Sequence, residues 1–148
     1  MKISTKGRYG LRALFDLAIS SGGEHISLNS IAQRQDVSES YLEHVFSTLR
    51  KAGIIKSVKG AQGGYMLSYS PSNITVGDIL RVLEGSLNIV EVNPDEKTSS
   101  QSIEYCVAGS VWEKINDSIA SVVDSITLED LVNEYRRLND YSSLMYYI

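Results

Sequence analysis

The feature that most constrains the fold of this chain is a pair of short capped helices directly before a glycine-rich loop. Ser27 is placed to cap a helix that runs through Gln35, and Ser38 is placed to cap a second helix that runs to about Ala52. Gly53 then provides an end to the second helix. Two helices joined by a three-residue break predict a helix-turn-helix, although an αα-hairpin in a helical core gives the same pattern.

The residues after Gly53 favour the helix-turn-helix. The segments "GIIKSV" and "YMLSY" have the apolar, β-prone character of strands, and they flank a loop that contains Gly60, Gly63 and Gly64. A phosphate-binding P-loop would need Lys and then Ser or Thr after its last glycine, at the start of a helix. Tyr65 and a β-prone run follow instead. We therefore predict a hairpin whose glycines supply positive φ and close backbone approach, as in the wing of a winged helix.

Helices are also predicted on both sides of this unit. The segment "STKGRYGLRALFDLAISSGG" carries apolar residues at helical spacing. Thr75 and Asp78 form a capping-box pattern at the start of "TVGDILRVLEG". From residue 86 to about residue 102 the chain turns polar, which predicts a linker or loop. The fold class is therefore mainly α with a small β-hairpin.

A long apolar stripe follows the polar segment and needs something to cover it. The cover is either the chain's own domain or a second copy of the chain. The residues of the stripe are Val111, Trp112, Ile115, Ile119, Val122 and Ile126. The predicted organisation is a winged helix-turn-helix domain over 1–85, a linker over 86–105, and a long helix with a C-terminal helix and tail over 106–148.

The charge of the chain is unevenly distributed. The net charge of −4 alone argues against nucleic acid, but residues 1–66 balance to +4 and the remaining residues to −8. This division indicates a cationic module on an anionic body, although ordinary variation along a chain gives similar differences. No segment approaches the ~20 apolar residues that span a bilayer. A single cysteine and an N-terminus without an apolar run predict a cytoplasmic protein that does not bind membranes.

Three segments of the chain resemble the Rrf-type winged-helix regulators of bacteria. They are "MKISTKGRYGLRALFDLA", "SLNSIAQRQDVSESYLEHVFSTLRKAGIIKSVKGAQGGYMLS" and "ITVGDILRVLEG". The resemblance implies a homodimer that binds double-stranded DNA at a near-palindromic operator. It also implies that the long helix in 106–148 is a dimerisation helix and that the apolar stripe is the dimer interface. The start, the phrase "VLEG" and the ending in Tyr-Ile are most similar to the family's repressors of cysteine metabolism. The alternative within the family is a regulator that responds to redox state, nitric oxide or iron–sulfur clusters.

The resemblance also implies which residues contact DNA. The second helix would offer hydroxyls to phosphate or bases, His44 as a base reader, and Glu43 either as a cytosine acceptor or as a solvated residue. Arg50 and Lys51 at the end of this helix, and Lys6 and Arg8 near the start of the chain's first predicted helix, would neutralise phosphate. The wing tip would enter the minor groove. The full set is Lys6, Arg8, Ser38, Ser40, Tyr41, Glu43, His44, Arg50, Lys51, Lys59 and Gly60.

The signal that such a regulator would sense is less constrained by the sequence. Iron–sulfur members of the family hold the cluster with three closely spaced cysteines, whereas this chain has only Cys106, so no cofactor and no metal are expected. Cys106 is either an inert buried side chain or a redox switch. Resemblance to the cysteine-metabolism repressors implies cysteine synthase as a partner. Tyr147 and Ile148 at the C-terminus either dock to that partner or pack on the dimer helices. No catalytic constellation is apparent, and we expect no enzyme.

Overall fold

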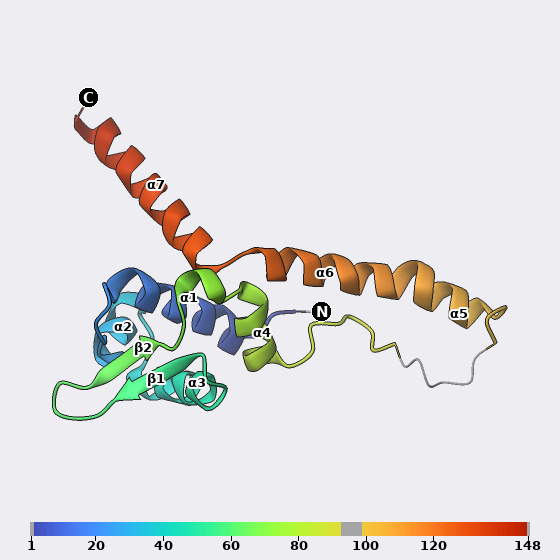
Figure 1. The fold of residues 1–148 in the computed structure, drawn as a ribbon, viewed down its shortest axis with the longest axis horizontal. Coiled ribbons are helices and arrows are strands. Elements are labelled where there is room, and N and C mark those ends of the chain that lie inside the picture. Colours follow the sequence, from blue (N-terminus) through green and yellow to red (C-terminus); the bar gives the residue numbers. More distant parts are fainter. Residues whose placement is uncertain (1, 93–98, 148) are drawn as a thin grey trace.

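The computed structural model describes residues 2–92 and 99–147, with side chains as far as residue 140. Figure 1 shows a helical body with a small hairpin, from which two long helical segments extend in different directions. The body consists of α1 (Thr5–Ser20), α2 (Leu28–Gln35), α3 (Glu39–Lys51), β1 (Ile55–Val58), β2 (Gly64–Leu67), a short 3₁₀ turn (Pro71–Asn73) and α4 (Val76–Glu84). The remaining elements are α5 (Ile103–Val107), a π-helical turn (Ala108–Trp112), α6 (Glu113–Ser125) and α7 (Leu128–Tyr147).

The predicted helix-turn-helix is confirmed together with its caps. The Ser27 hydroxyl accepts a hydrogen bond from the Ser30 amide over 3.2 Å, and the Ser38 hydroxyl accepts one from the Tyr41 amide over 3.1 Å. These bonds satisfy amides that have no partner inside the helix. Between the helices, Asp36 adopts a left-handed conformation with φ 54° and closes α2. The chain therefore turns within three residues, as predicted.

The glycines of the hairpin have the two roles predicted for them. β1 and β2 pair antiparallel, and Gly60 in the loop between them has φ 122°. Gly64 pairs in an extended strand, and Tyr65 forms an isolated bridge with Ile26. A β-carbon on Gly64 would collide with the carbonyl oxygen of Ile26. The wing is thus held against the loop before α2 by a backbone approach that only glycine permits.

The hydrophobic core lies among α1, α2, α3, α4 and the base of the hairpin. Its largest fully buried side chains include Phe46 and Leu49 from α3, and Leu14 and Leu17 from α1. α7 contributes Leu128, which is fully buried in the same cluster, and Leu131, which is partly buried and packs against it. The mainly α fold with a small β-hairpin is therefore confirmed, and one side of α3 is fixed against its neighbours.

The long helical segment over 103–125 leaves this body and projects away from it (Figure 1). At 1.5 Å per residue it is roughly 35 Å long. Its last turns pack on α4, where Ile119 and Val123 contact a cluster formed by Val76 and Leu80 with Leu87. The helix begins at Ile103, within the predicted linker 86–105, and residues 93–98 of that linker lie outside the described residues.

The six residues of the predicted stripe differ in their environment, and Trp112 and Ile119 are half-buried. Val111, Ile115 and Val122 are exposed in the single chain, at 38%, 37% and 58% of their full accessibility. Ile126, by contrast, follows the end of α6 in an extended conformation and packs against the α4 cluster of its own chain. The expectation that Ile126 continues the helical stripe is therefore wrong, because α6 ends one residue earlier.

Replacing Gly64 by Ala tests the close approach of the wing to Ile26. The new methyl group would push β2 away from the Ile26 carbonyl, so we expect a loss of about 1–3 kcal/mol in the free energy of unfolding. Denaturant unfolding at one protein concentration measures it. Ala61→Gly, in the exposed loop of the same hairpin, is the control. Equal stability of Gly64→Ala and the unsubstituted protein would contradict this account of the wing.

Candidate DNA-binding surface

The exposed side of α3 carries the polar residues that the sequence assigned to base reading. Ser40, Glu43 and His44 are exposed, whereas Leu42 and Val45 on the other side are buried. The amphipathic spacing of α3 therefore fixes which side chains can meet a partner. Ser38 is also exposed, and its hydroxyl accepts a hydrogen bond from the Tyr41 amide. A contact between this hydroxyl and DNA would therefore have to coexist with the helix cap or replace it.

Tyr41 has a different environment from the one expected. Its hydroxyl oxygen is buried, and no hydrogen-bond partner for it is found among the described residues. Its ring meets the Tyr9 ring edge-on at a centroid distance of 6.5 Å, and the Arg12 guanidinium lies 4.8 Å from the Tyr9 centroid. A phosphate contact through the hydroxyl does not fit this arrangement. The other contact expected for Tyr41, between its ring and a thymine methyl, stays a prediction. In this structure Tyr41 packs α3 against α1.

Four cations lie near the ends of α1 and α3. Arg50 and Lys51 are exposed in the last turn of α3. Lys6 is half-buried, and its Nζ donates to the Thr48 hydroxyl over 3.3 Å, which brings α1 to α3. The exposed Arg8 donates to the Thr5 hydroxyl at the start of α1. Short polar bonds of this kind position the cations without neutralising their charge.

The wing places a further cation beyond the helices. Lys59 and Gly60 are exposed at the turn of the hairpin. The base of the wing is anchored by Tyr65, whose ring packs edge-on against the Phe46 ring of α3 at 5.1 Å. The loop is held by a hydrogen bond between the His25 ring and the Gln62 carbonyl. Sequence reasoning did not give His25 this role, because the two residues are far apart in the chain.

The N-terminus of α1 is fixed by a contact that sequence reasoning also missed. Glu84, at the end of α4, accepts hydrogen bonds from both the amide and the hydroxyl of Ser4. Ser4 in turn caps α1 by accepting the Gly7 amide. A β-carbon on Gly7 would collide with the Glu84 carboxylate. The segments "STKG" and "VLEG" therefore fit each other, and this fit orients the end of α1 that carries Lys6 and Arg8.

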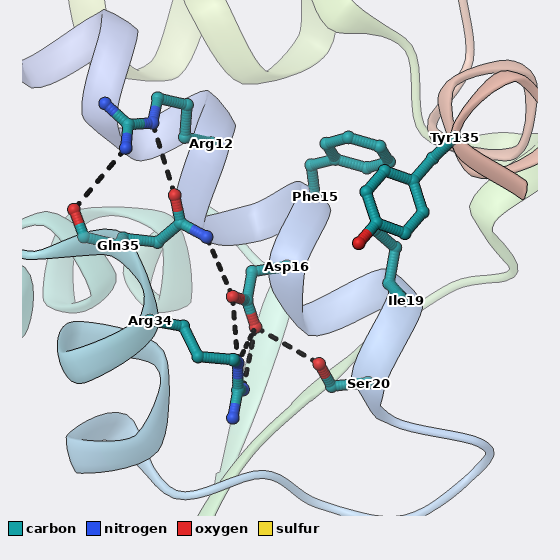
Figure 2. Close-up of a pocket in the computed structure, with 8 residues that line it drawn as sticks. All are labelled: Arg12, Phe15, Asp16, Ile19, Ser20, Arg34, Gln35 and Tyr135. Atoms are coloured by element: carbon teal, nitrogen blue, oxygen red, sulfur yellow. Dashed lines mark hydrogen bonds and ion pairs between the residues drawn. The ribbon is translucent and has the colours of Figure 1, made fainter. Parts of the chain in front are cut away.

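A buried carboxylate connects α1 with the end of α2 (Figure 2). Asp16 is 7% exposed and accepts hydrogen bonds from the Arg34 guanidinium, the side-chain amide of Gln35 and the Ser20 hydroxyl. Gln35 also accepts hydrogen bonds from Arg12 through its side chain and its backbone carbonyl. The network lines a cavity of about 550 Å³ that Phe15 and Tyr135 close from the other side. It sets the angle between α1 and α2.

The environment of Asp16 lowers its pKa. Burial alone would raise the pKa, but hydrogen bonds from Arg34 and Gln35 and the positive charge of Arg34 outweigh burial. The carboxyl therefore stays ionised at neutral pH, and it acts as a structural anchor of the helix-turn-helix.

The chain does not carry a donor set that suits an iron–sulfur cluster. The sequence contains one cysteine, Cys106, and two histidines, His25 and His44, both in the winged helix. In the described ranges 2–92 and 99–147, no group of three or more His, Cys, Asp or Glu side chains is close enough to hold a metal ion. Cys106 is exposed, contrary to the expectation of a buried side chain, and its sulfur lies 4.0 Å from the Ser110 hydroxyl.

Comparison with known proteins decides the family. The profile of the Rrf2 family, described as iron-dependent transcriptional regulators, matches residues 3–134. The chain belongs to the Rrf2 family. Its Rrf2 relatives include the HTH-type transcriptional regulator CymR of Bacillus subtilis, 49% identical over 90% of this chain and 91% of CymR. IscR of Pectobacterium atrosepticum, also an HTH-type transcriptional regulator, is 36% identical over 94% of this chain and 84% of IscR.

Solved structures of Rrf2 proteins agree with the fold. The structure of CymR (YrzC), the global cysteine regulator of B. subtilis, has a TM-score of 0.75 at 48% identity, with 90% of this chain and 98% of CymR covered. T. potens IscR has a TM-score of 0.71 at 50% identity, with 91% of this chain and 88% of IscR covered. The winged-helix prediction is confirmed, and this Rrf2 chain is a transcriptional regulator and not an enzyme.

Two further expectations concern the C-terminus and membranes. The proposed docking residue Ile148 lies outside the described residues, and for Tyr147 only the helical backbone of α7 is described. As for membranes, the described part of the chain contains no helix that is both long and apolar enough to cross one. The assignment of residues to DNA contact and to the dimer interface stays a prediction at this point.

Replacing Asp16 by Asn tests the anchor between α1 and α2. Because the folded pKa lies below the unfolded value of about 3.9, the ionised carboxyl stabilises the fold fully above that value, and this contribution is lost as the pH falls through the folded pKa. At pH 7 we expect Asp16→Asn to cost about 1–3 kcal/mol of unfolding free energy. The difference should shrink below about pH 4.

Urea unfolding of both proteins at several pH values and one protein concentration measures this difference. Asp117→Asn, an exposed carboxylate on α6, is the matched control and should change stability little at any pH. A stability difference for Asp16→Asn that is the same at pH 3 and pH 7 would show that the charge of Asp16 plays no part.

Proposed function

We propose that this protein is a homodimeric repressor of cysteine or sulfur metabolism genes that binds a near-palindromic operator. The observation that supports this most is its 49% identity to CymR over nine-tenths of both chains. The structure adds a winged helix whose exposed polar helix and cationic wing suit a duplex. Two such units read two half-sites about one helical turn, or a multiple of it, apart.

Each unit meets DNA through three parts. The N-terminal half of α3 enters the major groove, where His44 and Ser40 face base edges and Glu43 accepts from cytosine or disfavours wrong sites. Arg50 and Lys51, with Lys6 and Arg8 at the start of α1, neutralise phosphates. Lys59 and Gly60 bring the wing to the minor groove, where lysine adds attraction with little sequence preference because it sheds its hydration less readily than arginine.

The dimer forms through the projecting helix. Val111, Ile115 and Val122 are left exposed on α6 and the turn before it, and half-buried Trp112 lies beside them. An apolar groove of about 470 Å³ runs along the same face, lined by Lys114, Ile115, Ser118, Ile119, Val122 and Val123. A second copy of the helix covers this face by the same side chains, as expected for a two-fold axis. Ile119 serves both this contact and the α4 cluster.

Regulation by cysteine supply is supported by the likeness to CymR, the global cysteine regulator of B. subtilis. We propose cysteine synthase as the partner, with Tyr147 and Ile148 as the docking end. The alternative is a redox, nitric oxide or iron–sulfur responsive regulator, which the likeness to IscR proteins supports. One cysteine per chain fits a cluster poorly, and Cys106 remains available as a redox switch.

Selection of bound sequences from random duplex DNA tests the proposal. We expect an enriched near-palindrome with two half-sites, whose binding weakens steeply with salt. Repeating the selection with cysteine synthase, with and without its acetylserine substrate, tests the partner. An anaerobically purified sample that carries colour and iron would favour the alternative. No enrichment at low salt would overturn the proposed function.

Replacing Lys59 by Ala tests the role of the wing. We expect weaker binding to matched and mismatched operators by a similar factor, because the wing contributes charge rather than base recognition. The slope of log affinity against log salt should become shallower by about 0.9 for each phosphate that the variant no longer neutralises. Fluorescence anisotropy across a salt series measures both quantities.

Arg136→Ala is the control for this experiment, because Arg136 is an exposed cation on α7 and not on the wing. It should leave both affinities close to those of the unsubstituted protein. A loss for Lys59→Ala that is confined to the matched operator would contradict the assigned role.

A further inference from the structure

The corner between α6 and α7 is joined to the start of α4 by backbone hydrogen bonds. The Val76 amide donates to the Ile126 carbonyl over 2.8 Å, and the Leu128 amide donates to the Ile74 carbonyl over 2.9 Å. Thr75 and Thr127 lie opposite each other in this isolated antiparallel bridge. The winged helix and the projecting helix are therefore connected by this backbone bridge as well as by the chain that precedes α5.

An ion pair adds a directional contact beside this bridge. Both nitrogens at the end of Arg81, on α4, donate to the two carboxylate oxygens of Asp124, on α6, over 2.6 and 3.0 Å. The apolar contacts between the same helices, in which Ile119 and Val123 pack against the cluster that contains Leu80, are non-directional and tolerate sliding. A bidentate guanidinium–carboxylate pair constrains both angle and register.

Gly77 leaves the space that this ion pair occupies. A β-carbon at Gly77 would collide with the Asp124 carboxylate, and it would lie 2.7 Å from an Arg81 nitrogen. Gly77 lies in the first turn of α4 and has no positive φ, so the backbone conformation does not require glycine there. The absence of a side chain instead allows α6 to approach α4 closely.

We propose that Arg81, Asp124 and Gly77 are positioning residues that set the spacing of half-sites which the dimer accepts. The inference rests on the proposed function, since it requires two winged helices on one duplex. If the projecting helices form the dimer, the α4–α6 joint fixes the direction of each winged helix relative to the two-fold axis. The three residues then control DNA recognition without touching DNA.

The geometry of DNA makes such a joint a sensitive control. One additional base pair between half-sites moves the second half-site by about 3.4 Å and rotates it by about 34°. A rigid joint cannot follow this rotation, so the protein discriminates between spacers. A loosened joint allows the second winged helix to follow this rotation at a lower cost in binding free energy. The discrimination between spacers then falls, while the contacts within each half-site are unchanged.

The test compares operators whose spacer is optimal, one base pair shorter or one base pair longer. For Asp124→Asn and Arg81→Ala we expect the preference for the optimal spacer to fall by about two- to fivefold, the range for a partly exposed ion pair. Arg81→Lys keeps the positive charge but loses the two parallel hydrogen bonds of the guanidinium, so its spacer preference should lie between that of these variants and that of the unsubstituted protein. Gly77→Leu, which displaces Asp124, should act in the same direction as Asp124→Asn.

Three controls separate this role from general damage. Arg137→Ala removes an ion pair within α7, at 2.6 Å from Glu134, and should leave spacer preference unchanged. Sedimentation should show the same dimer for every variant, and affinity for an isolated half-site should not change. An unsubstituted protein that binds no paired half-sites overturns the proposed function. If it binds them with a clear spacer preference that Asp124→Asn and Arg81→Lys both retain in full, the positioning role is wrong.

Discussion

The structure depends on one constraint, which is that α3 buries one face in a core shared with α1, α2 and α4. Leu42, Phe46 and Leu49 are fully buried on that face, and moving any of them would open the centre of the domain. The opposite face is thereby held outward, and the wing follows because Tyr65 packs on Phe46. The surface that can meet DNA is a consequence of packing on its far side.

Much of this could be read from the sequence, because the signals are local. Ser27 and Ser38 cap helices by bonding amides three residues ahead, and Gly60 marks a turn by its backbone conformation. Such features need only a few consecutive residues. The π-helical turn at Ala108–Trp112 is an exception, since an ordinary helical pattern does not reveal an inserted residue.

The contacts that orient the elements could not be read in this way. Asp16 meets Arg34, Glu84 meets Ser4, and Asp124 meets Arg81, and each pair is separated by many residues of chain. A charged residue on a predicted helix looks solvated until its partner is known. The same limit explains why the environments of Tyr41 and Ile126 were not predicted. The Tyr41 ring packs on Tyr9, and Ile126 packs on the cluster at α4, and both partners are distant in sequence.

The fold is connected with the proposed function at two levels, within one chain and between two chains. Within a protomer, the core and the joint at α4 hold the winged helix and the projecting helix as one unit. In the proposed dimer, the exposed face of that helix would determine how two winged helices are arranged on DNA. The winged helix, its exposed cations and the apolar stripe on the projecting helix would then serve one proposed function, which requires two chains to act together.

Sedimentation equilibrium on the protein with an operator duplex tests this central claim most directly. The account predicts a dimer in dilute solution and a complex of two chains per duplex. A single chain per duplex, with the free protein monomeric at the same concentrations, would contradict it.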